Sequence, residues 1–182
     1  ASYYYSFTRL AVSGSIEFRG KAHDVRGFAW MDHEFGSSIL LKDQAGWDWF
    51  SLQLDDGTDV MVFHLRKQDG STERPFGTFV PRTGVPEDLD GRSIVITPGE
   101  MWTSPHTKAQ YPLTWTVKVP DKKLSLEVTP LIRDQELASE RGAGIAYWEG
   151  AVSVKGLRDG KSVRGRGYME LTGYARSLGG SL

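Results

Sequence analysis

The sequence contains no cysteine, so disulfide bonds, thiolate nucleophiles and cysteine-ligated zinc are all excluded. It also lacks any apolar run near the roughly 20 residues that a membrane-spanning helix needs, so we expect no transmembrane segment. Neither sign of charge is in clear excess, because 22 Lys and Arg residues balance 23 Asp and Glu residues, for a formal net charge of -1. A nearly neutral chain creates no global field that attracts nucleic acid, so we expect no nucleic-acid partner.

We expect no signal peptide in the first residues, because the start at 1–5 is rich in tyrosine and does not have the form of one. A strand-like start with no lead-in indicates a cut through a longer protein. The length of 182 residues suits one all-β domain without splitting. We therefore expect residues 1–182 to form a single domain, preceded by another part of a longer protein.

Helical periodicity is scarce, and a short helix is expected only at 134–141. Turn signals are frequent instead, with Asp-Gly dipeptides at 56–57, 69–70, 90–91 and 159–160. The first and last of these predict hairpins that join 47–54 to 60–66 and 146–155 to 163–175. Further strands are expected at 3–12, 15–18, 25–35, 37–41, 94–97, 113–119 and 124–131.

Many short strands joined by Gly and Asp turns indicate a sandwich or a barrel. We expect the barrel, of antiparallel lipocalin-like type, because closure removes exposed edges. The proline-rich stretch 70–91 is the longest candidate loop, and we expect it to form a lid over the mouth of the barrel.

Strand alternation gives three strands an apolar face each. These faces carry Phe50, Leu52 and Leu54; Met61, Phe63 and Leu65; and Met169 and Leu171. The same register adds Asp48 to the Phe50 face and groups His33 with Met31 and Phe35. A polar group in apolar surroundings needs a partner, so we expect His33 and Asp48 to bond each other or to face a ligand.

The opposite faces combine aromatic rings with carboxylates, a mixture that lines a ligand pocket or forms exposed surface or an interdomain contact. Their members are Trp30, Trp47, Trp49, Tyr147 and Tyr168 with Asp32, Glu34, Glu149 and Glu170. A β-bulge near Gly36 or Gly46 would exchange the two faces. The candidate ligand-binding residues, drawn from both faces, are Trp30, Phe35, Trp47, Trp49, Phe63, Tyr147, Trp148, Glu149, Tyr168 and Glu170.

Five sequence motifs occur in the same order as in a known family: ASYYYSFTRL at 1–10, AWMDHEFG at 29–36, GWDWFSLQL at 46–54, YWEGA at 147–151 and GYMELTGY at 167–174. They resemble the AttH-like and carotenoid 1,2-hydratase (hydroxyneurosporene synthase) family almost end to end. Members of this family look like two lipocalin-like domains in tandem, and this chain is similar to the second. The resemblance implies a preceding lipocalin-like domain as a partner, and an exported (periplasmic) or membrane-associated protein; the sequence itself leaves the compartment open.

Hydratase members of the family add water to an isolated carbon–carbon double bond of an acyclic carotenoid, without a cofactor. Protonation of such a bond creates a tertiary carbocation, so the site needs an acid, aromatic walls and a positioned water. The resemblance implies Asp48 or Asp32 as the acid and His33 as the group that orients water. Two positions depart from the family pattern: Phe35 stands where relatives commonly have tryptophan, and Phe63 stands where tyrosine is frequent.

Three functions follow as expectations. The first is a lipocalin-like domain that binds an apolar isoprenoid or polyene-like molecule in an aromatic-lined pocket. The second is a cofactor-free hydratase, isomerase or cyclase that acts on an isoprenoid double bond by acid–base catalysis. The third is a structural domain that docks an upstream lipocalin-like domain.

Some of the candidate residues also have a purely structural interpretation. His33 can be a core histidine bonded to a carboxylate, and Trp47 and Trp49 can be packing residues. The histidines show no metal-ligand spacing, so no metal is predicted.

Overall fold

The structure is a computed structural model that describes residues 2–36, 40–138 and 146–179. The chain divides into two compact units, Ala1–Ile39 and Leu40–Leu182. Both are built almost wholly from antiparallel strands, which confirms the all-β class. No helix in the described ranges is both long and apolar enough to cross a membrane.

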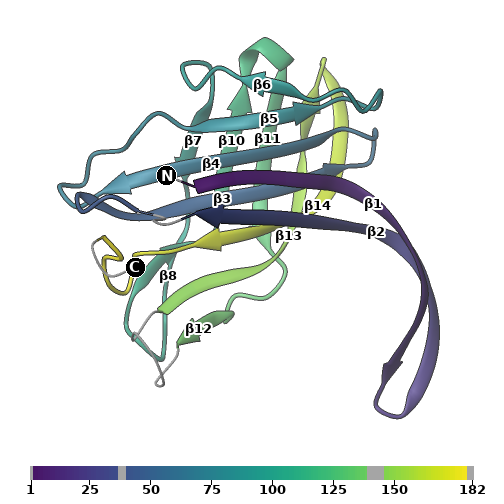
Figure 1. Cartoon of the computed structure of the whole chain (residues 1–182), viewed down its shortest axis with the longest axis horizontal. Helices are drawn as coiled ribbons and strands as arrows, with labels where there is room; N and C mark the ends of the chain where they lie inside the picture. Colours follow the sequence, from purple (N-terminus) through teal and green to yellow (C-terminus); the bar gives the residue numbers. More distant parts are fainter. Residues whose placement is uncertain (1, 37–39, 139–145, 180–182) are drawn as a thin grey trace. The chain divides into compact units, whose positions relative to one another are not determined.

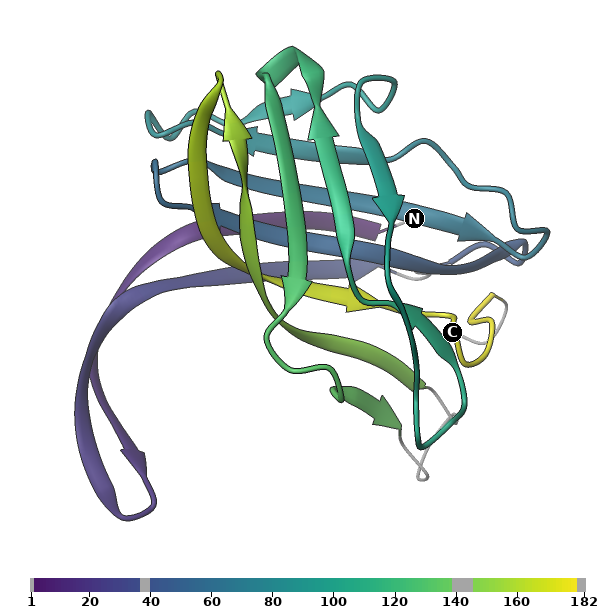
Figure 2. The same ribbon diagram turned by 180° about the vertical axis from the view of Figure 1, so that it is seen from behind.

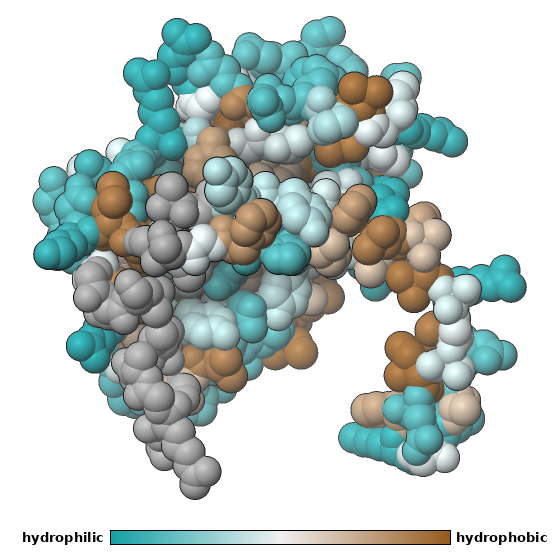
Figure 3. All heavy atoms as spheres, in the orientation of Figure 1, coloured by the Kyte–Doolittle hydropathy of each residue, from teal (hydrophilic) through white to brown (hydrophobic). Residues whose placement is uncertain are grey.

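The first unit is a long hairpin of β1 (Ser2–Phe18) and β2 (Lys21–Gly36) (Figure 1). The two predicted strands at 3–12 and 15–18 form one continuous strand, with a register shift between Phe7 and Leu10. Arg19 and Gly20 both have positive φ, which suits the right-handed twist of a tight hairpin turn. Apolar side chains are exposed along this hairpin among polar ones (Figure 3).

The second unit is one long curved sheet with a smaller two-stranded ribbon. Its strands are β3 (Gln44–Leu54), β4 (Asp59–Lys67), β5 (Phe76–Val80), β6 (Glu87–Leu89), β7 (Val95–Pro98), β8 (Met101–Thr103), β9 (Gln110–Pro112), β10 (Trp115–Val119), β11 (Leu124–Pro130), β12 (Glu136–Ala138), β13 (Ala146–Arg158) and β14 (Lys161–Leu171). The main sheet has the order β6-β5-β4-β3-β14-β13-β11-β10-β7, with β12 paired to β13, while β8 pairs with β9. A single 3₁₀ turn, η1 (Pro120–Lys122), precedes β11.

The sheet bends back on itself, so that β7, β10 and β11 run across β3, β4 and β5 (Figures 1 and 2). Its path ends at β6 on one side and at β7 on the other, and these two strands are not paired in the described part of the chain. The hydrogen bonds of the described strands thus form an open curved sheet and not the closed barrel that the sequence predicts.

Both predicted Asp-Gly hairpins are confirmed. The turn at Asp56-Gly57 joins β3 to β4, and the turn at Asp159-Gly160 joins β13 to β14. Asp159 and Gly160 have φ of 49° and 74°, the two positive values that a type I′ turn requires. The last strand ends at Leu171, four residues before the predicted end.

The predicted lid at 70–91 is wrong, because β5 and β6 lie inside this range and extend the sheet beyond β4. Proline lacks the N–H of the strand ladder, yet here Pro75, Pro81 and Pro86 stand just outside the strand ends. The predicted helix at 134–141 is wrong where the structure describes it, since β12 occupies Glu136–Ala138; residues 139–141 lie outside the described residues. Of the predicted strand 37–41, residues 37–39 also lie outside them, and Leu40 and Leu41 are not in a strand.

The hydrophobic core lies between the two halves of the curved sheet. Phe50 of β3 meets Trp115 of β10 edge to face, with ring centroids 5.4 Å apart. Phe50, Leu52 and Leu54 are buried in this core, as the alternation of β3 predicts, and Met169 and Leu171 of β14 join them. Burial of these large apolar side chains is the main stabilising contribution of the fold, at about 2 kcal/mol per fully buried side chain.

In β4 the predicted faces are exchanged. The structure buries Val60 and Val62 in the core, and the residues predicted to point inward lie on the other face of the sheet: Met61, Phe63 and Leu65. The cause is the hairpin register, which sets Phe50 directly opposite Val62. Cross-strand partners share a face, so the even-numbered residues of β4 follow those of β3 into the core. The one register shift of this pair, between Gln44 and Gly46, precedes Trp47 and leaves the faces of β3 as predicted.

Candidate functional site

Seven of the ten predicted ligand-binding residues lie on one face of the second unit's sheet, opposite the core. They come from four neighbouring strands and are Trp47 and Trp49 (β3), Phe63 (β4), Tyr168 and Glu170 (β14), and Tyr147 and Glu149 (β13). Phe76 of β5 pairs with Phe63 and belongs to the same face. We call these eight residues the aromatic–carboxylate face.

Aromatic rings stack across one side of this face. The rings of Trp47 and Phe63 are stacked at 6.2 Å between centroids, and Phe63 stacks in turn on Phe76 at 4.9 Å. Phe76 remains 47% exposed and Tyr168 40% exposed, whereas Trp49 is almost fully buried. The series therefore offers a flat apolar surface that extends over β3, β4 and β5.

Two carboxylates meet on the other side of this face, because Glu149 and Glu170 are cross-strand partners. Burial raises the pKa of Glu149 above its ordinary value. The pKa values of Tyr147 and Tyr168 are raised too, first by burial and then by the neighbouring charges of Glu149 and Glu170. Burial thus favours the protonated form of Glu149, the group that could donate a proton on this side of the face.

The remaining hairpin candidates belong to the first unit. His33 shares one face of the hairpin with five apolar neighbours: Tyr3, Tyr5, Phe7, Met31 and Phe35. The Tyr5 hydroxyl lies 3.2 Å from Nδ1 of His33, and Phe35 contacts the imidazole ring edge-on at 5.2 Å. This confirms the predicted grouping of Met31, His33 and Phe35.

Asp32 lies on the other face of the hairpin, directly opposite Ser6. Its Oδ1 accepts hydrogen bonds from the Ser6 hydroxyl at 2.5 Å and from Nε1 of Trp30 at 2.8 Å. Asp32 and His33 belong to one unit and Asp48 to the other, so a shared site of these residues stays a prediction.

Asp48 is fully buried on the core face of β3, the place that strand alternation predicts. Its carboxylate has three partners in its own unit. Oδ1 accepts the Tyr174 hydroxyl at 2.8 Å and Nε of Arg66 at 3.2 Å, and Oδ2 lies 3.3 Å from Nδ1 of His64. The guanidinium of Arg66 supplies the positive charge that a buried carboxylate needs.

The cluster of Asp48, His64 and Arg66 also holds the segment after β14, residues 172–174, against the sheet. Arg66 also donates to the carbonyl of Thr172, and its guanidinium lies 3.8 Å from the centre of the Tyr174 ring. Gly173 has a positive φ of 72°, and a Cβ there would meet the Ala45 carbonyl at 2.1 Å, so only glycine fits. Burial, followed by the charge of Asp48, raises the pKa of Tyr174 well above its ordinary value.

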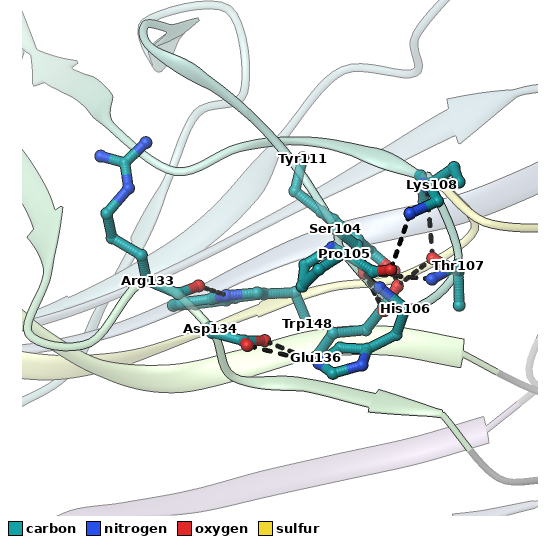
Figure 4. A network of polar contacts seen from close by, with 11 residues as sticks. Ser104, Pro105, His106, Thr107, Lys108, Tyr111, Arg133, Asp134, Glu136 and Trp148 are labelled. Carbon is teal, nitrogen blue, oxygen red and sulfur yellow. Dashed lines mark hydrogen bonds and ion pairs between the residues drawn. The ribbon is translucent and has the colours of Figure 1, made fainter.

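A second polar cluster continues from the Tyr174 ring. Tyr111 lies 5.4 Å from Tyr174 between ring centroids and donates its hydroxyl to Glu136 at 2.8 Å. Glu136 also accepts the hydroxyl groups of Ser104 and Thr107, which ties the turn at 104–108 to β12 (Figure 4). Burial raises the pKa of Glu136, but these hydroxyl donors outweigh it and the net direction is downward. The Glu136 carboxyl group therefore favours its ionised form, and its hydrogen bonds join the turn at 104–108 to β12.

Trp148, also a predicted ligand-binding residue, has no exposed surface and lies in the core. Its Nε1 donates to the carbonyl of Arg133 at 2.7 Å, on the core side of β13 (Figure 4). A surface pocket of about 380 Å³ lies elsewhere, at the turns after β3 and β13. Acidic and basic side chains line it together, among them Asp55, Arg158 and Lys161, and it contains no predicted ligand-binding residue.

His64, Arg66 and Tyr174 are the residues that sequence reasoning missed around Asp48. A signal for His64 is present in the sequence, because a tight turn at Asp56-Gly57 that pairs residues 53 and 59 also pairs 48 and 64. No such local signal reveals Tyr174, which lies beyond the end of β14 and approaches Asp48 only through tertiary structure.

Comparison with known proteins identifies the family of the chain and solved structures with a similar fold. An AttH-like family model matches residues 1–174. A crystal structure of an AttH candidate from Nitrosomonas europaea is 42% identical, with a TM-score of 0.83. Kievitone hydratase from Nectria haematococca is 19% identical with a TM-score of 0.74, which shows a shared fold. Each alignment covers 96% of this chain and 53% of the other, so the chain spans about half the length of these solved structures. No curated protein matches it. With a family match over nearly its whole length, the chain belongs to the AttH-like family.

Proposed function

We propose that this chain is a lipocalin-like domain that binds an apolar isoprenoid or polyene-like molecule against its aromatic–carboxylate face. One observation carries the proposal: seven residues picked from the sequence as ligand-binding share one face of neighbouring strands. Stacked rings favour a flat, unsaturated or branched hydrocarbon, since large apolar area is gained without an unpaired polar group.

A fluorescence titration of the chain with farnesol, a soluble isoprenoid alcohol, tests this proposal. We expect saturable quenching of tryptophan emission and a loss of affinity of about tenfold in Trp47→Ala, because a ring contact of this size contributes about 1.5 kcal/mol. Phe18→Ala is the matched control, as Phe18 is an aromatic residue of the first unit, 61% exposed, that is not a member of this face. Quenching that rises linearly without saturation contradicts the proposal.

A second proposal is a cofactor-free hydratase that acts on an isoprenoid double bond. It is supported by the raised pKa of Glu149, the direction that a general acid needs, and by the fold shared with kievitone hydratase. Glu149 would give its proton to one alkene carbon, water would add to the resulting cation, and the bound water would return a proton to the carboxylate. The assignment of the acid to Asp48 or Asp32, and of water orientation to His33, stays a prediction.

Incubation with lycopene in ¹⁸O-labelled water tests the hydratase proposal. We expect a product heavier by one labelled water molecule, and we expect Glu149→Gln to abolish its formation while farnesol affinity stays within about threefold. Glu127→Gln is the matched control, since Glu127 is an exposed carboxylate that pairs with Lys155. Farnesol binding without any labelled product contradicts the hydratase and leaves the binding domain. If neither binding nor product is found, docking of a preceding lipocalin-like domain becomes the favoured function.

A further inference from the structure

The cluster around Asp48 lies on the core side of the sheet, and the proposed function uses none of its missed residues. A buried aspartate beside an arginine is a common structural ion pair, but this one also holds an imidazole. Nδ1 of His64 lies 3.3 Å from Oδ2 of Asp48, the Tyr174 hydroxyl donates to Oδ1, and Nε of Arg66 lies 3.2 Å from both oxygens. The imidazole therefore has a fixed partner at one nitrogen.

The chemistry of the pair fixes the tautomer of His64. An ionised carboxylate only accepts hydrogen bonds, so Nδ1 must carry the hydrogen that points to Asp48. In the neutral ring the lone pair then lies on Nε2, which becomes the basic nitrogen. Hydrogen bonds from Arg66 and Tyr174 hold the Asp48 carboxylate in place. The carboxylate in turn fixes the orientation of the His64 ring.

Nε2 of His64 is accessible. Within the described residues, Nδ1 with Asp48 is the only polar contact of the ring. The buried side-chain atoms without a partner in the same residues belong to Arg158 and Ser177, so Nε2 is not among them. The His64 side chain is 14% exposed, against 0% for Asp48. A buried carboxylate behind a ring whose free nitrogen reaches the surface is the arrangement of a general base.

We propose that Asp48 and His64 form an acid–base pair, in which Nε2 of His64 takes a proton from a water molecule or from the hydroxyl group of a ligand. In this step the O–H bond breaks, its electron pair stays on oxygen, and the proton forms an N–H bond at Nε2. The imidazolium that results lies beside the Asp48 carboxylate, which it shares with the Arg66 guanidinium. Asp48 acts as a positioning residue and His64 as the proton acceptor.

His106 provides an internal comparison. It faces Asp134 through Nε2 at 3.2 Å, not through Nδ1, and both side chains are more than half exposed. The two histidines thus present opposite nitrogens to their carboxylates. Long-range ¹H–¹⁵N NMR of the wild-type chain distinguishes the tautomers directly. We expect the Nδ1–H tautomer for neutral His64 and the Nε2–H tautomer for neutral His106.

Acylation by diethyl pyrocarbonate, mapped by mass spectrometry, tests whether Nε2 of His64 is a free base. We expect His64 to react faster than His106 although its exposed fraction is 14% against 57%. A merely structural histidine would react more slowly, in line with its lower exposure, and that result would overturn the proposal. In Asp48→Asn the His64 rate should fall about fivefold, the equivalent of one hydrogen bond, with His106 unchanged. The wild-type comparison stands even if this variant fails to fold, and an Nε2–H tautomer at His64 also contradicts the pair.

Discussion

Asp48 places a fully buried carboxylate next to the aliphatic and aromatic side chains of the core. Strand alternation on the Phe50 face was enough to predict its burial. Its partners were harder to predict, because Arg66 and Tyr174 reach it from the next strand and from beyond β14. A sequence shows which face a residue takes, but the partner of a buried charge depends on register and on the path of distant segments.

Removal of the Asp48 carboxylate tests how much the fold depends on this cluster. Asp48→Ala leaves the guanidinium of Arg66 largely buried without its counter-charge, so we expect the free energy of unfolding to fall by about 3 kcal/mol. Urea denaturation measures the change. Asp134→Ala is the matched control, since its exposed partner His106 should make it cost less than about 1 kcal/mol. An equal loss of unfolding free energy in the two variants would show that the buried cluster contributes no more to stability than the exposed pair.

Glu149 predicts a pH dependence with a definite sign. Burial raises its pKa in the folded protein above the ordinary value of 4.5. The folded state then binds the proton more tightly than the unfolded state, so wild-type stability falls as pH rises from 4.5 through the folded pKa. Glu149→Gln removes this loss, and we expect the variant to be the more stable protein at pH 7 and equal to wild type below pH 4.5. Thermal unfolding across this range checks it, and a variant less stable at pH 7 contradicts it.

The hairpins are the elements that the sequence predicts best, because each is a local unit with its own turn signal. Asp56-Gly57 and Asp159-Gly160 mark both turns between long apolar runs. β5 and β6 were missed for the opposite reason, since their short runs stand between prolines that also suit a loop. The first residues of the expected helix at 134–141 proved to include β12, which is a strand only because β13 lies beside it.

The β3–β4 turn also contains a carboxylate that responds to acid. Burial raises the pKa of Asp56, but hydrogen bonds from the Thr58 backbone and from Arg158 more than offset this, so its pKa lies below 3.8. The contribution of Asp56 to stability is therefore present above pH 3.8 and is lost as pH falls through the folded pKa. We expect Asp56→Asn to be less stable than wild type at pH 7, with the difference vanishing at lower pH. A difference that persists unchanged at pH 2 in urea titrations would exclude this origin.

At the scale of the whole molecule, the aromatic–carboxylate face combines two hairpins that are distant in the sequence, β3–β4 and β13–β14, with Phe76 of β5. Trp47, Trp49, Tyr168 and Glu149 could be grouped in advance because each lies on a strand with clear alternation. Phe63 was assigned to the core, since the register of the β3–β4 hairpin was not used to link the two strands. The division of the chain into two compact units was not predicted, because strand alternation and turn signals mark strands in both units alike.

The measurement that tests the account most directly is an NMR titration of the indole N–H signals with farnesol. The chain has six tryptophans, and two of them, Trp47 and Trp49, belong to the aromatic–carboxylate face. Trp115 and Trp148 are buried in the core and serve as controls in the same spectrum. We predict saturable shifts of the Trp47 and Trp49 signals while those of Trp115 and Trp148 stay in place. Saturable shifts confined to the core tryptophans, or no saturable shift at all, would contradict a ligand site on this face.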